Sequence, residues 1–231
     1  MTSAANSQYL QAIEDIESNL NFLDPGEAVD DTRWQDRKSA NTRYTILEST
    51  IECLAEFGYS KTSTQLVTEN AEISRGTMLH HYATKADLIS AVIDFINFKR
   101  LRKFYESVKK LSDVERVEKG VGLELWWRFI KEPEYEAYLE LNVAARKDAD
   151  LKRVFDKKAA AHDAFILRTL PMVFPEWKGK PAEDLQLAHD FTVASLSGLL
   201  LNSNVIKSRK RRQGVRTLIY ETISRLRDSE I

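Results

Sequence analysis

The chain has 231 residues, a formal net charge of −1 and 43% hydrophobic residues, enough for a packed core and unlike a disordered tail. Its five prolines and eight glycines are sparse, and apolar residues between them recur at helical spacing. One cysteine, Cys53, excludes an internal disulfide framework and a cysteine-rich zinc site, and we expect it to be a small buried residue of a helix. No stretch approaches the ~18 apolar residues of a membrane span, and no secretory signal is evident. We predict an all-α protein of the reducing cytoplasm, with no metal and no cofactor.

Residues 1–32 form an acidic arm, with seven Asp and Glu residues and no Lys or Arg. Apolar residues at three- and four-residue steps from Tyr9 to Leu20 predict a short amphipathic helix within it. The sign of the charge then reverses from Arg33 to Arg43, which is either a solvated helix start or a segment lying along a DNA backbone. A second basic run, Lys207–Arg212, is interpreted as a solvated connection; a second nucleic-acid patch or a docking place for the acidic arm are the alternatives.

Residues 39–87 have the pattern of several capped helices in succession. A helix from Ser39 carries an apolar stripe up to Phe57, and Gly58 follows it at a C-cap position. Thr62 and Gln65 form the pattern of a capping box that opens a short helix. Ser74 is expected to cap a helix from Arg75 to about Tyr82, and Thr84–Asp87 to cap a long one. Two short helices joined by a tight turn predict a helix-turn-helix over residues 62–82.

The second short helix would enter a DNA major groove with its N-terminal side chains. Arg75 can pair with a guanine edge, and Gly76 lets the backbone approach the duplex. Lys85 stands where the helix dipole disfavours a cation, which indicates a phosphate contact. The predicted DNA-contact set is Thr62, Thr64, Ser74, Arg75, Gly76, Thr77, His80, His81, Tyr82 and Lys85, with Arg37, Lys38 and Arg43 of the approaching segment.

Three segments, Gly58–Ser63, Ala71–Met78 and His80–Lys85, resemble the DNA-binding domain of the tetracycline-repressor (TetR/AcrR) family, and the resemblance spans about residues 39–95. It implies that Tyr82 closes the core of the small domain. Glu72 stands where the family usually has a glycine, and Leu79 where it usually has a tyrosine that contacts the backbone. The residues it places at DNA-contact positions are Arg75, Gly76, Thr77, His81 and Lys85.

Beyond residue 111, helices are expected near 114–131, 133–146, 150–173, 181–206 and 212–228. We predict a DNA-binding domain over 33–86 and a larger effector-binding and dimerisation domain over 87–231. The resemblance implies an effector pocket in the larger domain and a four-helix bundle made by two subunits. Candidate effector residues are Trp126, Trp127, Phe129, Tyr138, Asn142, Arg146, His162, Phe165, His189 and Phe191. Candidate dimer residues are Leu196, Leu199, Leu200, Leu218, Ile219 and Ile223.

These features predict a homodimeric DNA-binding regulator, a repressor released from a palindromic operator by a small apolar or aromatic effector. An activator with the same fold is an alternative. A helical adaptor that binds only proteins would have no need of Arg75 and Lys85 on the recognition surface. No nucleophile, base and orienting residue form a recognisable signature and no phosphate-binding glycine loop is present, so we do not expect an enzyme.

Overall fold

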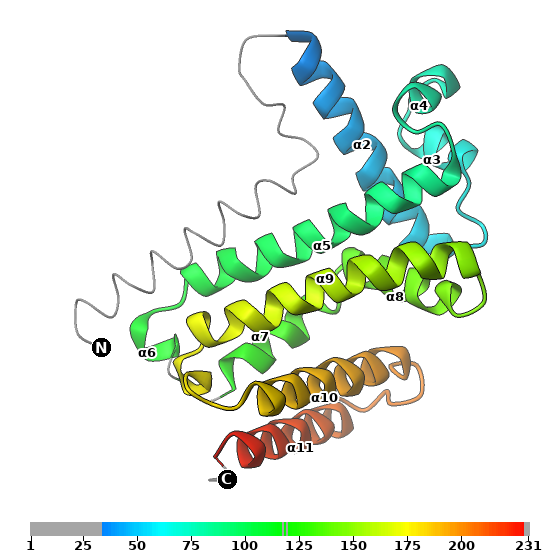
Figure 1. The fold of residues 1–231 in the computed structure, drawn as a ribbon. Helices are drawn as coiled ribbons and strands as arrows, with labels where there is room; N and C mark the ends of the chain where they lie inside the picture. Colours follow the sequence, from blue (N-terminus) through cyan, green and yellow to red (C-terminus); the bar gives the residue numbers. More distant parts are fainter. Residues whose placement is uncertain (1–33, 117, 119, 229–231) are drawn as a thin grey trace. The chain divides into compact units, whose positions relative to one another are not determined.

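The computed structural model describes residues 34–116, 118 and 120–228, so the acidic arm and its expected helix lie outside the described residues. Helices and short connections make up the described part, which contains no β-strand, as predicted (Figure 1). None of its helices is long and apolar enough to span a membrane. The helices are α2 (Trp34–Phe57), α3 (Thr64–Asn70), α4 (Arg75–His81), α5 (Lys85–Lys109), α6 (Asp113–Arg116), α7 (Val121–Phe129), α8 (Pro133–Ala145), α9 (Ala149–Val173), the 3₁₀ turn Pro175–Trp177, α10 (Ala182–Leu201) and α11 (Arg209–Asp228).

The described residues divide into two compact units. The N-terminal unit contains residues 34–103 and 132–162, and the C-terminal unit contains residues 104–131 and 163–228. The domain boundary predicted after residue 86 falls inside α5 and inside the N-terminal unit. That functional division stays a prediction.

The N-terminal unit is built around α2, which begins at Trp34, earlier than the Ser39 expected from the sequence. Its apolar stripe is buried from Ile46 to Leu54, with Ile46 and Leu47 both 0% exposed, whereas Phe57 at its end is 40% exposed. Cys53 lies on the same helix at 1% exposed, where burial raises the pKa of its thiol, so it is the small core residue expected. Gly58 ends the helix in a left-handed conformation, φ 76°, which confirms the predicted C-cap.

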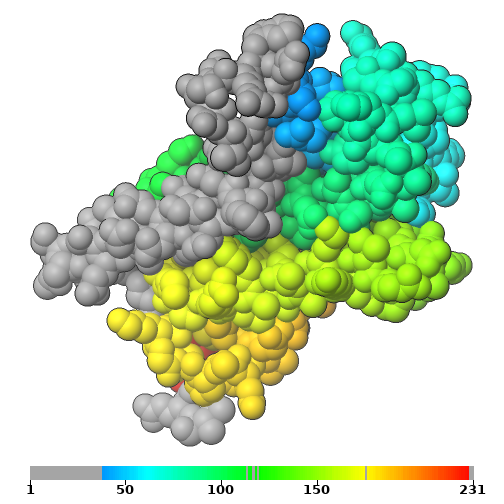
Figure 2. All heavy atoms as spheres, turned by 45° about the horizontal axis from the view of Figure 1, so that its top comes forward, coloured from blue at the N-terminus to red at the C-terminus, as the bar shows by residue number. Residues whose placement is uncertain are grey.

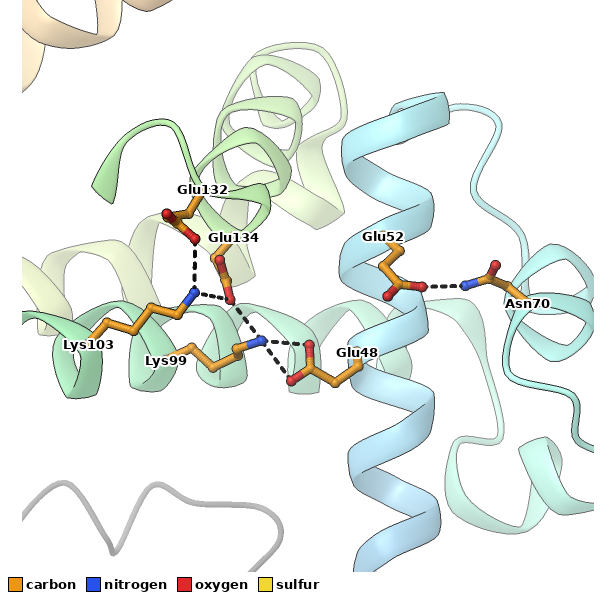
Figure 3. Close-up of polar contacts among 7 residues, drawn as sticks. All are labelled: Glu48, Glu52, Asn70, Lys99, Lys103, Glu132 and Glu134. Carbon is orange, nitrogen blue, oxygen red and sulfur yellow. Dashed lines mark hydrogen bonds and ion pairs between the residues drawn. The ribbon is translucent and has the colours of Figure 1, made fainter. Parts of the chain in front are cut away.

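A network of ion pairs ties α2, α5 and α8 together within this unit (Figure 3). Glu134 is 4% exposed, and its Oε1 accepts from the ammonium groups of Lys99, at 2.8 Å, and Lys103, at 2.9 Å. Lys99 also donates to Glu48 of α2 at 2.6 Å, and Lys103 to Glu132 at 3.3 Å. Burial alone would raise the pKa of Glu134, but the two lysines outweigh it and hold that pKa below its ordinary value. The buried carboxylate therefore stays charged and joins three helices.

The C-terminal unit departs from the sequence prediction at its first helix. The single helix expected over 114–131 is wrong, because α6 ends at Arg116 and α7 begins only at Val121. Gly120 precedes α7 with φ 92°, and a Cβ there would lie 2.8 Å from the ring of Tyr220. A left-handed residue cannot continue an α-helix, so the chain breaks here. Helices α10 and α11 pack side by side in the same unit (Figure 1).

Candidate nucleic-acid interface

The helix-turn-helix opens at α3, whose N-cap is Ser63 rather than Thr62. The Ser63 Oγ accepts a hydrogen bond from the Leu66 amide at 3.1 Å. Thr62 is 1% exposed, and its hydroxyl donates to the Gly58 carbonyl at 2.8 Å. Its assignment to the DNA-contact set is therefore corrected, because the side chain is closed inside the turn after α2. Thr64 is the first residue of α3 and is half-buried.

The turn between α3 and α4 contains a strained residue. Glu72 has φ 52°, in the left-handed region that glycine occupies without strain. The amide of Glu72 donates to the Glu69 carbonyl at 3.3 Å and that of Ile73 to the Thr68 carbonyl at 3.2 Å. The turn thus keeps the backbone that a glycine would give, although the sequence supplies a glutamate.

Helix α4 is held by a cap at one end and a core residue in the middle. Ser74 caps it as predicted, because its Oγ accepts from the Thr77 amide at 3.0 Å and pairs with the Thr77 hydroxyl at 2.8 Å. Met78 is 1% exposed and anchors the inner side. Arg75, Gly76 and His80 are exposed on the outer side, and the surfaces of α3 and α4 lie on the face shown in Figure 2. The helix therefore offers a guanidinium and bare backbone near its N-terminus.

The side chains of Leu79, His81 and Tyr82, at the end of α4, differ in exposure and in what they can offer to a duplex. Leu79, which stands where the family usually has a tyrosine, is 47% exposed and has no hydrogen-bond donor for a phosphate. Tyr82 is 8% exposed, and burial raises the pKa of its hydroxyl. Tyr82 is thus the core residue that the resemblance implied, and its place in the DNA-contact set is corrected because its ring is enclosed. Burial, followed by the electrostatic influence of the neighbouring His80 and Arg43, lowers the pKa of His81, which favours the neutral imidazole.

Helix α5 begins with the predicted cap. The amide and the hydroxyl of Thr84 donate to Asp87 Oδ2 at 3.0 and 2.7 Å, and the Asp87 amide donates back to the Thr84 Oγ1 at 3.1 Å. Lys85 follows as the first helical residue, half-buried, with its Nζ donating to the Tyr59 carbonyl at 3.0 Å. No local sequence pattern indicates that Tyr59 lies beside Lys85, 26 residues further along the chain.

The basic approach segment lies on α2. Lys38 is exposed, whereas Arg43 is half-buried and its Nη1 donates to the Ser39 hydroxyl at 3.1 Å. The side chain of Arg37 lies outside the described residues, although its backbone belongs to α2.

The candidate effector residues fall in both units. Tyr138, Asn142, Arg146 and His162 belong to the N-terminal unit, where Asn142 and Arg146 are exposed on or just after α8 and Tyr138 packs against Phe155 with ring centroids 5.2 Å apart. The rest belong to the C-terminal unit, and the structure brings two of those together. The rings of Trp126 and His189 lie 6.4 Å apart, and His189 Nε2 pairs with Asp163 Oδ1 at 2.6 Å.

The other candidates of the C-terminal unit line its aromatic core or its surface. Phe129 meets Phe104 edge-on at 6.2 Å, and Phe165 meets Tyr105 at 6.4 Å. Trp127 lies under the Arg216 guanidinium at 5.1 Å. Phe191 is 38% exposed on α10. Trp126 and His189 are therefore two effector candidates whose rings lie close together in this unit.

The predicted dimer residues prove to have two different surroundings. Leu196, Leu199 and Ile219 are 0%, 3% and 3% exposed within the single chain. They pack inside the subunit, so their assignment to a subunit interface is corrected. Leu218 is 63% exposed, whereas Leu200 and Ile223 are half-buried. Helix α10 also carries three exposed large apolar side chains that lie toward one side of the helix, Leu187, Phe191 and Leu201. None of them was predicted as a dimer residue.

A helical fold with an exposed, capped second helix of a helix-turn-helix defines a DNA-binding regulator of the helix-turn-helix class. Residues 46–92 match the family model described as bacterial regulatory proteins, tetR family. Helix-turn-helix-type transcriptional regulators of Mycobacterium tuberculosis and Mycobacterium bovis, themselves uncharacterized, are each 27% identical over 151 residues, covering 62% of this chain and 76% of the relative. These findings show that residues 46–92 are similar to the DNA-binding domain of tetR-family bacterial regulatory proteins, and they support a transcriptional regulator of that kind.

Solved structures of the same fold cover most of the chain. A TetR-family regulator of Cytophaga hutchinsonii gives a TM-score of 0.63 at 16% identity, covering 84% of this chain and 98% of that one. A transcriptional regulator of Pseudomonas aeruginosa gives 0.60 at 19% identity, covering 84% and 92%. The multidrug binding protein EbrR, complexed with imidazole, gives 0.55 at 21% identity, covering 86% and 97%. At these identities the likeness concerns the fold.

Proposed function

We propose that the protein is a homodimeric repressor that reads a palindromic operator with α4 and leaves it when a small effector binds. The observation that carries the proposal is the outer side of α4, where Arg75 and Gly76 are exposed directly after the Ser74 cap. An arginine at the N-terminal end of a recognition helix can form a bidentate pair with guanine O6 and N7. Lys85 and Lys38 would add phosphate contacts, within the DNA-binding domain proposed for residues 33–86.

Dimerisation is proposed through the exposed apolar faces of α10 and α11. Leu187 is 58% exposed, Leu201 61% and Leu218 63%, and burying these side chains against a second subunit would stabilise a dimer. Gly198 of α10 and Gly214 of α11 have open space where a Cβ would stand, so a second pair of helices can approach closely. Two copies joined about a two-fold axis would present two recognition helices to a palindromic site.

Effector binding is proposed within the part of the chain after residue 86. EbrR, of similar fold, was solved with a small imidazole bound, which supports a small-molecule role for the larger part of this chain. The Trp126 ring and the His189 imidazole, which pairs with Asp163, bring an aromatic and a polar side chain together, a combination suited to a small apolar or aromatic compound. Such a ligand weakens the operator complex only if it prefers a dimer geometry that DNA does not.

The proposal is tested by enriching duplexes from a random pool with the wild-type chain. A two-fold symmetric sequence should emerge, and Trp126→Phe and His189→Ala should keep operator binding while altering release by effectors found in a thermal-shift screen. If no sequence is enriched above background, the proposed binding to a specific operator is wrong. If neither substitution alters release by the effectors, the effector does not bind at Trp126 and His189.

A further inference from the structure

The placement of Lys85 depends on one neighbouring residue, Tyr59, in the turn after α2. The Lys85 Nζ donates to the Tyr59 carbonyl at 3.0 Å and lies 4.3 Å from the centroid of the Tyr59 ring. Carbonyl and ring face both attract an ammonium, so Tyr59 fixes the direction of this long side chain. The ammonium has three donors, and the carbonyl uses one of them, which leaves two N–H groups to meet an anion.

Tyr59 is in turn held by Asp148, at the corner between α8 and α9. The Tyr59 hydroxyl donates to Asp148 Oδ2 at 3.2 Å. The other oxygen, Oδ1, accepts from the amides of Asp150 and Leu151 at 3.1 and 3.0 Å, so the same carboxylate caps α9. These amides, the Leu151 amide first, together with the Tyr59 hydroxyl and the Lys85 charge, lower the pKa of Asp148. The carboxylate is therefore charged at neutral pH and rigidly placed.

The three residues form a chain of contacts that runs from the start of α9 to the start of α5. We propose that Tyr59 and Asp148 are positioning residues that hold the Lys85 ammonium ready for a DNA phosphate, an inference that rests on the proposed DNA-binding function. A lysine side chain normally loses rotamer entropy when it binds a phosphate. If the side chain is already ordered in the free protein, less entropy is lost on binding, so the contact is stronger. The α8–α9 corner thereby becomes part of the DNA-contact machinery, and Asp148 has a role in addition to capping.

The test uses the full chain, the duplex enriched by the wild type, and fluorescence anisotropy over a series of KCl concentrations. Lys85→Ala should weaken binding and reduce the slope of log K against log salt by about one. Tyr59→Phe and Asp148→Asn should each raise Kd about three- to tenfold, the effect of losing one ordinary hydrogen bond, because each change acts on DNA only through the placement of Lys85. Asp150→Asn is the matched control: it makes the same chemical change two residues away, on a side chain that is 91% exposed, and should change Kd less than about twofold.

A double-mutant cycle separates positioning from general destabilisation. In the Lys85→Ala background, Tyr59→Phe should leave Kd unchanged, because there is no ammonium left to position. If Tyr59→Phe raises Kd by the same factor in both backgrounds, or if Lys85→Ala leaves Kd and the salt slope unchanged, the positioning role is overturned while operator binding stands. If the wild-type chain enriches no sequence, the proposed function fails, and this inference fails with it.

Discussion

Replacing Glu134 with glutamine should destabilise the N-terminal unit by about 2 kcal/mol. Removing one partner of a buried ion pair costs about 3–5 kcal/mol when it leaves a charge unpaired. Here Lys99 keeps Glu48 at 2.6 Å, and Lys103, whose side chain is 38% exposed, keeps Glu132. The loss is therefore nearer to that of the charged hydrogen bonds themselves, about 1.5–3 kcal/mol.

Urea unfolding followed by circular dichroism at 222 nm, at one fixed protein concentration, measures this loss. Asp156→Asn is the control, because the Lys152–Asp156 pair has side chains 58% and 55% exposed and should contribute under about 0.5 kcal/mol. The pKa of Glu134 is lowered in the folded chain, so its contribution is complete above the ordinary value of 4.5 and disappears as pH falls through the lower folded value. The difference between wild type and Glu134→Gln should accordingly narrow in acid. If Glu134→Gln lowers the free energy of unfolding at pH 7 by no more than Asp156→Asn does, the Glu134 ion pairs do not stabilise the fold as proposed.

Three further substitutions test separate parts of the account. Glu72→Gly should raise the free energy of unfolding by about 0.5 kcal/mol, because relief of a left-handed glutamate exceeds the extra chain entropy of glycine; a loss of stability in urea unfolding would contradict this. Ser74→Ala should cost about 1 kcal/mol by removing the cap that accepts from the Thr77 amide, and should weaken operator binding in anisotropy measurements; unchanged values of both would be inconsistent with the cap. Leu218→Glu should give monomers in sedimentation velocity, whereas Thr217→Glu beside it should stay dimeric; a dimeric Leu218→Glu chain would place the interface elsewhere.

Local sequence signals were enough to predict much of the helix-turn-helix. Gly58, Ser74 and Thr84 each end or begin a helix as expected, because caps are decided by residues within one turn. Thr62 was assigned wrongly because it stands in a run of hydroxyl residues, any of which can cap, and only the structure shows Ser63 accepting from Leu66.

Contacts between distant residues could not be predicted from the same signals. Helix α10 is apolar on both its inner and outer sides, so periodicity could not separate the buried Leu196 and Leu199 from the exposed Leu187 and Leu201. The pairing of Lys99 with Glu134 joins residues far apart in the chain and leaves no local pattern. Asp148 lies in the gap between the helices expected over 133–146 and 150–173, and its hydrogen bond with Tyr59 joins residues far apart in the chain.

We expect α4 to read DNA sequence through Arg75. This is measured by comparing Kd for the enriched operator with Kd for a scrambled duplex of the same length and composition, in the wild-type and Arg75→Ala chains at one salt concentration. Loss of a bidentate contact to guanine should reduce the operator preference by about five- to a hundredfold, while Kd for the scrambled duplex changes much less. An Arg75→Ala chain that keeps the wild-type preference would contradict the account.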